Sequence, residues 1–304
     1  MKSHQFGGSW TDTKLEILRQ YLIPYRQIFT TSAKAKHFKT IYIDAFAGTG
    51  ERVDPNLSPD VADLIGDTDP SERDAYKKGS ARIALEVTPP FDRYVFVEKQ
   101  PERSAELRVM VRSEFPNLVP RCNIVQGDAN GYLQENLPRV DWDNWRAVLF
   151  LDPYGMAVEW ETIKIIAETR AIDLWVLFPV GQGVNRLLTR ASTPPPEWEA
   201  RLTRMFGTEE WKARFYAPSR QQDIFGDTPG MLKDTSFDLI GEYFLERLRA
   251  TFAGVAPHAA KLENSRNVPL YWLCFAAGNP RGAGIAVKIA NHLLGQQARQ
   301  RRKK

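Results

Sequence analysis

The segment from Ile41 to Gly50 constrains the fold of this chain more than any other. Its apolar residues read as a buried strand that ends in Asp44, and a Gly-x-Gly turn follows at Gly48 and Gly50. Such a turn lets a ligand approach the main chain closely. A second apolar strand, 147–152, ends in an acid, a proline and an aromatic residue. Because ligands of open α/β sheets bind where the strands end, the two segments predict a cofactor site and a chemical site on one sheet.

The remainder of the chain alternates between apolar runs of strand length and helical periods. Besides the strand 41–44, the pattern predicts strands at 93–98, 123–127, 147–152, 173–178, 259–262 and 270–276. The predicted helices run over 79–86, with Ser80 as the cap, and over 101–112, 129–136, 160–168, 237–249 and 282–294. Repeated strand–helix units are typical of an α/β fold with a doubly wound, mostly parallel sheet.

We expect a single domain across residues 1–304, since a chain with 43% hydrophobic residues can bury one large core. Four segments of it have distinct patterns. They are an N-terminal helical segment at 1–35 capped at Thr11, Asp12 or Thr13, an Asp- and Pro-rich loop or lid at 51–79, a helical cap insertion at 181–235, and a basic tail at 297–304. We expect the lid to order over a cofactor. The tail suits contact with phosphates, and a solvated, frayed terminus is the alternative.

The composition argues against several classes of protein. Cys122 and Cys274 are the only cysteines, which fits reduced thiols and cannot supply an iron–sulfur cluster. The four histidines are scattered without metal-ligand spacing, so no metal site is predicted. The longest apolar runs have strand length, and the first residues lack the apolar core of a signal peptide. We therefore expect a soluble, cytoplasmic protein without membrane contact.

Three acids, Asp44, Glu98 and Asp128, follow consecutive predicted strands. The acid after the second strand is placed to accept hydrogen bonds from ribose hydroxyls, and groups after the third can meet an adenine edge. The turn lacks the third glycine of a dinucleotide site and the Gly-Lys-Ser/Thr of a phosphate loop, which favours a nucleoside cofactor without phosphates. S-adenosylmethionine is the common one. The predicted cofactor-binding residues are Asp44, Phe46, Gly48, Gly50, Glu98, Asp128 and Ala129.

Those same residues also allow a plain interpretation. A glycine pair after a strand is a common turn, Glu98 could be a solvated strand end, and Asp128 could simply cap the next helix. The order and spacing of the three acids favour the cofactor site, because each acid falls where a separate part of one ligand would need it.

The sequence Asp152-Pro153-Tyr154 resembles the Asn/Asp-Pro-Pro-Tyr signature of methyltransferases that act on exocyclic amines of nucleobases. In that signature, the first side chain and a neighbouring carbonyl accept hydrogen bonds from the amine, and the aromatic ring stacks on the base. The catalytic contribution is mainly positioning. This chain departs from it at the second proline, where Tyr154 and Gly155 follow. An Asp-Pro turn that caps the following helix is the alternative.

Several parts of the chain resemble the three-Cys-motif partner protein family, commonly called TcmP, a bacterial and phage-associated group. They are 11–21 with Thr13 and Lys14, the strand and turn 42–50, the helix start 79–85, the strand ends 96–99 and 151–155, and the late motifs 184–186, 270–273 and 282–288. The resemblance implies a sheet of the class I S-adenosylmethionine methyltransferase type with a helical insertion. It also implies a partner chain with three clustered cysteines that resembles radical S-adenosylmethionine proteins.

Two functions follow as expectations. The first is an S-adenosylmethionine-dependent methyltransferase that acts on an amine of a nucleic acid or modified nucleobase. The alternative is a non-catalytic binding partner of the three-cysteine protein. Bulky residues of the insertion are candidate anchors for that partner, with a lid packed on its own sheet as the other interpretation. These residues are Trp198, Met205, Phe206, Trp211, Phe215 and Tyr216.

Overall fold

The computed structural model describes residues 9–48, 79–153, 155–190, 192–218, 231–264 and 266–301. Gly50, Tyr154 and nearly all of the predicted lid at 51–79 lie outside these residues. Their predicted roles therefore stay predictions.

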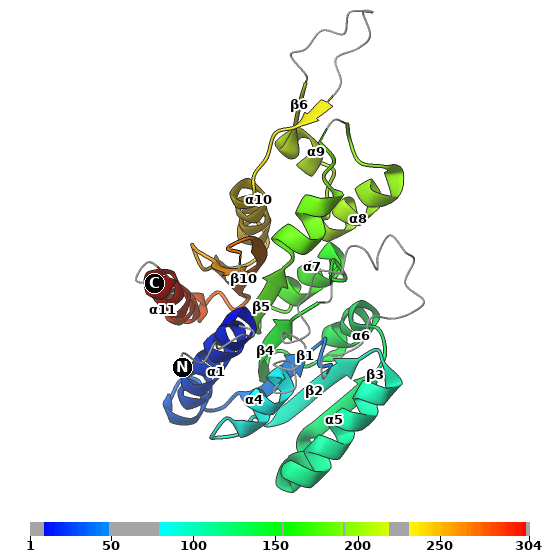
Figure 1. Cartoon of the computed structure of the whole chain (residues 1–304). Coiled ribbons are helices and arrows are strands. Elements are labelled where there is room, and N and C mark those ends of the chain that lie inside the picture. The colour runs from blue at the N-terminus through cyan, green and yellow to red at the C-terminus, as the bar shows by residue number, and fades with distance from the viewer. Residues whose placement is uncertain are drawn as a thin grey trace, which may run out of the picture.

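A mixed sheet of eight strands lies at the centre of the described residues, in the order β3-β2-β1-β4-β5-β10-β8, with β9 also paired to β10 (Figure 1). The first five strands along this order are parallel to one another, whereas β10 is antiparallel to β5, β8 and β9. The strands are β1 (Lys39–Asp44), β2 (Arg93–Glu98), β3 (Cys122–Gln126), β4 (Trp145–Leu151), β5 (Ile172–Phe178), β8 (Gly254–Val255), β9 (Ala260–Glu263) and β10 (Pro269–Ala277).

The order of the strands reverses at β1, which lies between β2 and β4. In the register, Asp44 at the end of β1 lies beside Phe96 of β2 and Phe150 of β4. Asp152 comes directly after β4. The topology therefore brings the two predicted strand ends together at the switch point of the sheet, where open α/β sheets bind their ligands.

Both faces of the sheet are buried, as the continuous apolar strands require. Along β1, Ile41 and Ile43 belong to one core layer and Tyr42 to the other. The helices α6 (Ala129–Asn136), α7 (Trp160–Glu168) and α10 (Phe237–Arg249) supply apolar side chains to the first layer. The helices α1 (Ser9–Thr31), α4 (Ser80–Glu86), α5 (Pro101–Glu114) and α11 (Ala283–Arg301) supply the second.

The insertion after β5 begins with the π-helical turn η4 (Val180–Asn185) and continues through α8 (Pro196–Phe206), α9 (Trp211–Phe215) and the small antiparallel pair β6 (Tyr216–Pro218) and β7 (Met231–Lys233). In Figure 1 it extends beyond one end of the central sheet. The Phe206 ring lies 6.0 Å from that of Phe178 and 5.2 Å from that of Tyr243. The insertion is therefore anchored on β5 and α10.

This packing corrects the expectation that the bulky residues of the insertion are exposed anchors. Met205, Phe206, Trp211, Phe215 and Tyr216 are all buried in the core layer, and Trp198 is partly buried against it. Their spacing identified a buried helix face. The same pattern of apolar residues occurs at interfaces and in cores, and here the position of the sheet shows that it belongs to the core.

Several predicted elements match the structure in both bounds, namely β2, α6, α7 and α10. Three details were wrong. Helix α1 begins at Ser9, so the three proposed caps lie inside its first turns; α11 continues to Arg301, so the tail at 297–304 begins within a helix; and β8 was not predicted. The short β8 lacks a period of its own because it has only two residues.

No helix within the described residues is both long enough and apolar enough to cross a membrane.

Candidate functional site

Asp44 lies at the end of β1 and is completely buried. Its carboxylate accepts hydrogen bonds from the Ser80 hydroxyl and, at 3.3 Å, from the backbone N–H of Phe46. Burial raises the pKa of Asp44 to about 7, and the hydrogen bond from Ser80 opposes that rise. The negative charge of Asp152 raises the pKa of Asp44 further.

The contact between Ser80 and Asp44 corrects the expected role of Ser80 as a helix cap. The capping position of α4 is Gly79, and no side chain caps that end. Ser80 is instead the first residue of the helix, and its hydroxyl turns toward the sheet because an acceptor, Asp44, lies there. A local sequence pattern could not reveal this acceptor, since it lies 36 residues earlier in the chain.

Asp152, predicted as a catalytic residue, forms a buried ion pair with Lys14 of α1. The Lys14 Nζ lies 2.5 Å from Asp152 Oδ2, and the two side chains are only 1% and 6% exposed. Lys14 was not among the predicted site residues. A signal was present: Lys14 occupies a helix face that also carries Thr11, Leu18 and Tyr21, all of them buried. A lysine on such a face needs a buried partner.

Glu98 and Gly48 are also brought together. The backbone N–H of Ala47 donates to the Val97 carbonyl at 3.0 Å, which holds the turn after β1 against the end of β2. Glu98 is buried, and its Oε1 accepts a hydrogen bond of 2.7 Å from the backbone N–H of Gln100. A Cβ atom added at Gly48 would lie 2.4 Å from Glu98 Oε2, so a residue with a side chain does not fit there without movement.

Asp128 is exposed and caps α6, because its Oδ1 accepts a hydrogen bond of 3.0 Å from the backbone N–H of Gly131. The adjacent Ala129 is buried. Neither residue lines the pocket described next. The plain interpretation of Asp128 as a helix cap is therefore observed, and its contact with a cofactor stays a prediction.

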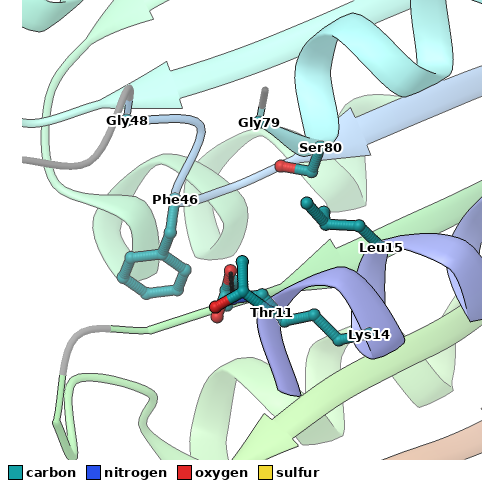
Figure 2. Close-up of a pocket in the computed structure, with 8 residues that line it drawn as sticks. Thr11, Lys14, Leu15, Phe46, Gly48, Gly79 and Ser80 are labelled. Atoms are coloured by element: carbon teal, nitrogen blue, oxygen red, sulfur yellow. Dashed lines mark hydrogen bonds and ion pairs between the residues drawn. The ribbon is translucent and has the colours of Figure 1, made fainter. Parts of the chain in front are cut away.

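A small pocket opens above these strand ends (Figure 2). Its floor and walls come from the first turns of α1, the turn after β1, the start of α4 and the end of β4. The lining residues are Thr11, Lys14, Leu15, Phe46, Gly48, Gly79, Ser80 and Asp152. Among them, Thr11 Oγ1 is buried and has no hydrogen-bond partner within the described residues. Asp44 lies beneath the lining, behind Ser80.

Pro153 is buried directly beside Asp152. Within the described residues, no group of three or more His, Cys, Asp or Glu side chains is placed to hold a metal ion.

The strand order and directions, with the antiparallel β10 inserted beside β5, define a class I methyltransferase-like Rossmann fold. The chain is structurally similar to folds of S-adenosylmethionine-dependent methyltransferases. No family model matches the sequence, and no curated protein matches it. Membership of the three-Cys-motif partner family therefore stays a prediction.

Three solved structures with this similarity are distant from this chain in sequence. Protein LPL1258 from Legionella pneumophila is 14% identical, with 96% of this chain and 94% of that chain covered and a TM-score of 0.48. A spermidine synthase in complex with the transition-state analogue AdoDATO is 10% identical, with 89% and 60% covered and a TM-score of 0.40. A Burkholderia thailandensis protein bound to S-adenosyl-homocysteine is 11% identical, with 91% and 82% covered and a TM-score of 0.30.

Proposed function

We propose that this chain is an S-adenosylmethionine-dependent methyltransferase with its active site at the carboxyl ends of β1, β2 and β4. The observation that carries the proposal is the buried group of Asp44, Asp152 and Lys14 around one pocket at the switch point of the sheet. A buried acid with a raised pKa, as at Asp44, is typical of functional sites.

The residues fit a cationic nucleoside cofactor. Asp44 and Glu98 are buried carboxylates on neighbouring strands, and Gly48 leaves beside Glu98 the space that a side chain would fill. Thr11 adds a buried hydroxyl without a partner among the described residues. When bound, the cofactor would supply a methyl group on a positive sulfonium, which is a good leaving group. In this proposal Asp44, Phe46, Gly48 and Glu98 hold it, with Asp128 and Ala129 at the far end.

The positive charge of the cofactor also explains the use of Asp44. With a pKa of about 7, this carboxyl is close to half protonated at neutral pH. A cation bound nearby favours the ionised form, so binding stabilises the charge that burial opposes. The Ser80 hydroxyl donates to that carboxylate and orients it.

The acceptor proposed here is an exocyclic amine of a nucleic acid or a modified nucleobase. Asp152 would accept a hydrogen bond from this amine, and the ion pair with Lys14 would fix the orientation of its carboxylate. Excluding water and holding the amine in line with the methyl group are the contributions of the chain to such a reaction. The basic residues at 297–304 would contact phosphates.

Titration calorimetry with S-adenosylmethionine and S-adenosylhomocysteine tests the cofactor. We expect saturable binding that Glu98→Gln weakens at least tenfold, whereas Glu102→Gln, at an exposed acid on α5, has no effect. Well-folded protein that binds neither compound would refute the proposal. For the acceptor, transfer of labelled methyl groups to DNA, RNA and protein fractions is expected to be lost in Asp152→Asn while cofactor binding is retained.

One observation favours the alternative function, a non-catalytic partner of a three-cysteine, radical S-adenosylmethionine-like protein. Lys14 already pairs with the carboxylate that an amine substrate would have to reach. Both cysteines of the chain are free thiols, so iron–sulfur chemistry would come from the other chain. Co-expression with a three-cysteine protein, followed by pull-down and methyl-transfer assays, separates the two functions. Stable association without transfer favours the partner, and turnover by this chain alone favours the enzyme.

A further inference from the structure

A second pocket lies at the opposite edge of the sheet from the candidate site. It is bounded by the second half of α1, by the start of β5 and by the first turns of α11. Figure 1 shows these two helices side by side on one face of the sheet. The lining residues are Tyr21, Tyr25, Ile28, Phe29, Arg146, Ala171, Asp173, Asn279, Gly282, Ile285, Ala286 and Ile289.

Asp173 is a buried acid in the lining of this pocket. Its Oδ2 accepts a hydrogen bond of 2.7 Å from the Tyr21 hydroxyl, and the residue is 9% exposed. Burial raises the pKa of Asp173 to about 7, and the bond from Tyr21 opposes the rise. The role proposed for the carboxyl edge of the sheet uses neither residue, because both lie at its amino edge.

Two further polar atoms in this pocket lack partners. Tyr25 is only 5% exposed, and its buried hydroxyl has no hydrogen-bond partner within the described residues. The Arg146 Nε is also buried without a hydrogen-bond partner within the described residues, whereas its Nη1 donates to the carbonyls of Trp142 and Trp145. Tyr25 and Arg146 line the same pocket. A buried polar group without a partner destabilises the fold, so two together point to a ligand that satisfies them.

Apart from Asn279, the remaining walls are apolar. Ile28 and Phe29 of α1 face Ala286 and Ile289 of α11, and Ile285 at the rim is 60% exposed. An apolar pocket with a few convergent polar groups is the usual form of a small-molecule site.

We propose that this pocket binds a small, predominantly apolar molecule that carries one uncharged oxygen acceptor, such as a carbonyl, with the acceptor directed at Tyr25 and Arg146. Both atoms can donate a hydrogen bond to such an oxygen. The Arg146 guanidinium disfavours a cationic ligand, and Asp173, which is ionised above its pKa of about 7, disfavours an anionic one at pH 8, because both groups line one small space. A neutral acceptor meets both donors without burying a further charge.

Benzamide is a suitable probe, with benzoate and toluene as matched arms that add a charge or remove the acceptor. Ligand-observed NMR on the full chain should show saturable binding of benzamide with a Kd on the order of 1 mM, as its small size allows. Binding of benzoate and toluene should be at least fivefold weaker, since each lacks one element of the recognition.

Two variants test the site itself. Tyr25→Phe removes the unpartnered hydroxyl, so it should weaken benzamide binding about fivefold without lowering the stability of the free protein. Ala286→Phe should fill the pocket and abolish binding, which a thermal melt of the folded variant controls. Absence of saturable benzamide binding would overturn the proposal. Equal binding of toluene, or a Tyr25→Phe protein that binds as well as the parent, would overturn the assigned acceptor.

Discussion

Lys14 and Asp152 form an ion pair across 138 residues of the chain, with 2.5 Å between Nζ and Oδ2 and almost no exposure of either side chain. The pair joins the first turns of α1 to the end of β4 and closes one side of the candidate active site. The same contact therefore attaches the N-terminal helix and holds a carboxylate of the candidate site.

Breaking this pair should be costly. Lys14→Met leaves the Asp152 carboxylate buried without its counter-charge, so we expect a loss of about 3–5 kcal/mol in the free energy of unfolding. Arg19→Met is the matched control, because Arg19 of the same helix pairs with Glu16 at the surface and is 50% exposed. Urea denaturation measures both. A double variant, Lys14→Met with Asp152→Asn, should recover part of the loss, and additive effects would contradict the coupling.

The stability of the protein should fall as the pH rises from about 4 to about 7. Asp44 and Asp173 both have a pKa raised to about 7 from the ordinary value of 3.8. Within that window, the folded state binds protons that the unfolded state has released, so each acid removes up to about 1.4 kcal/mol of stability per pH unit. Unfolding midpoints measured across the window should show this slope.

The variant Asp44→Asn tests whether Asp44 contributes to this pH dependence of stability. The amide cannot ionise, so the pH dependence should become shallower in this variant, and Asp173→Asn should have a similar effect. Asp141→Asn, at an exposed acid, serves as the control. A parent protein whose stability rises with pH between 4 and 7 would show that these two carboxyls are ionised in the fold.

Gly48→Ala should damage the cofactor site more than the fold. The added Cβ would lie 2.4 Å from Glu98 Oε2, so the turn or the carboxylate has to move. We expect at least a tenfold loss of S-adenosylmethionine binding, measured by calorimetry, with a decrease in stability of about 1–3 kcal/mol. Gly284→Ala in α11, where an added Cβ has no neighbour within 4 Å, should leave binding intact. Unchanged binding in Gly48→Ala would place the cofactor elsewhere.

Gly241→Ala should destabilise the protein, although alanine is the better helix former. In α10 the added Cβ would lie 2.4 Å from the Trp272 ring, a fully packed side chain of β10. We expect a loss of about 1–3 kcal/mol by urea denaturation. The same change at Gly284 should be neutral or stabilising, and a stabilised Gly241→Ala would mean that α10 and β10 are less closely packed.

The alternation of strands and helices, and the position of the acids at the strand ends, could be predicted from the amino-acid pattern alone. Helices α6, α7 and α10 have the bounds that their periodicity predicts, because helical spacing, N-caps and turn residues act over a few neighbouring residues. The placement of Asp44 and Asp152 at one edge follows from the parallel order of the strands, which the repeated strand–helix pattern already requires.

Which side chains contact each other depends on the tertiary packing, and the amino-acid pattern did not predict it. Lys14 reaches Asp152, Ser80 turns to Asp44 instead of capping its helix, and Tyr21 binds Asp173 across 152 residues. The aromatic face of the insertion is likewise buried on β5 and α10 instead of exposed to a partner. A periodic pattern predicts that one face of a helix is apolar or carries a charged residue. The residue that contacts this face depends on the packing of elements that are distant in sequence.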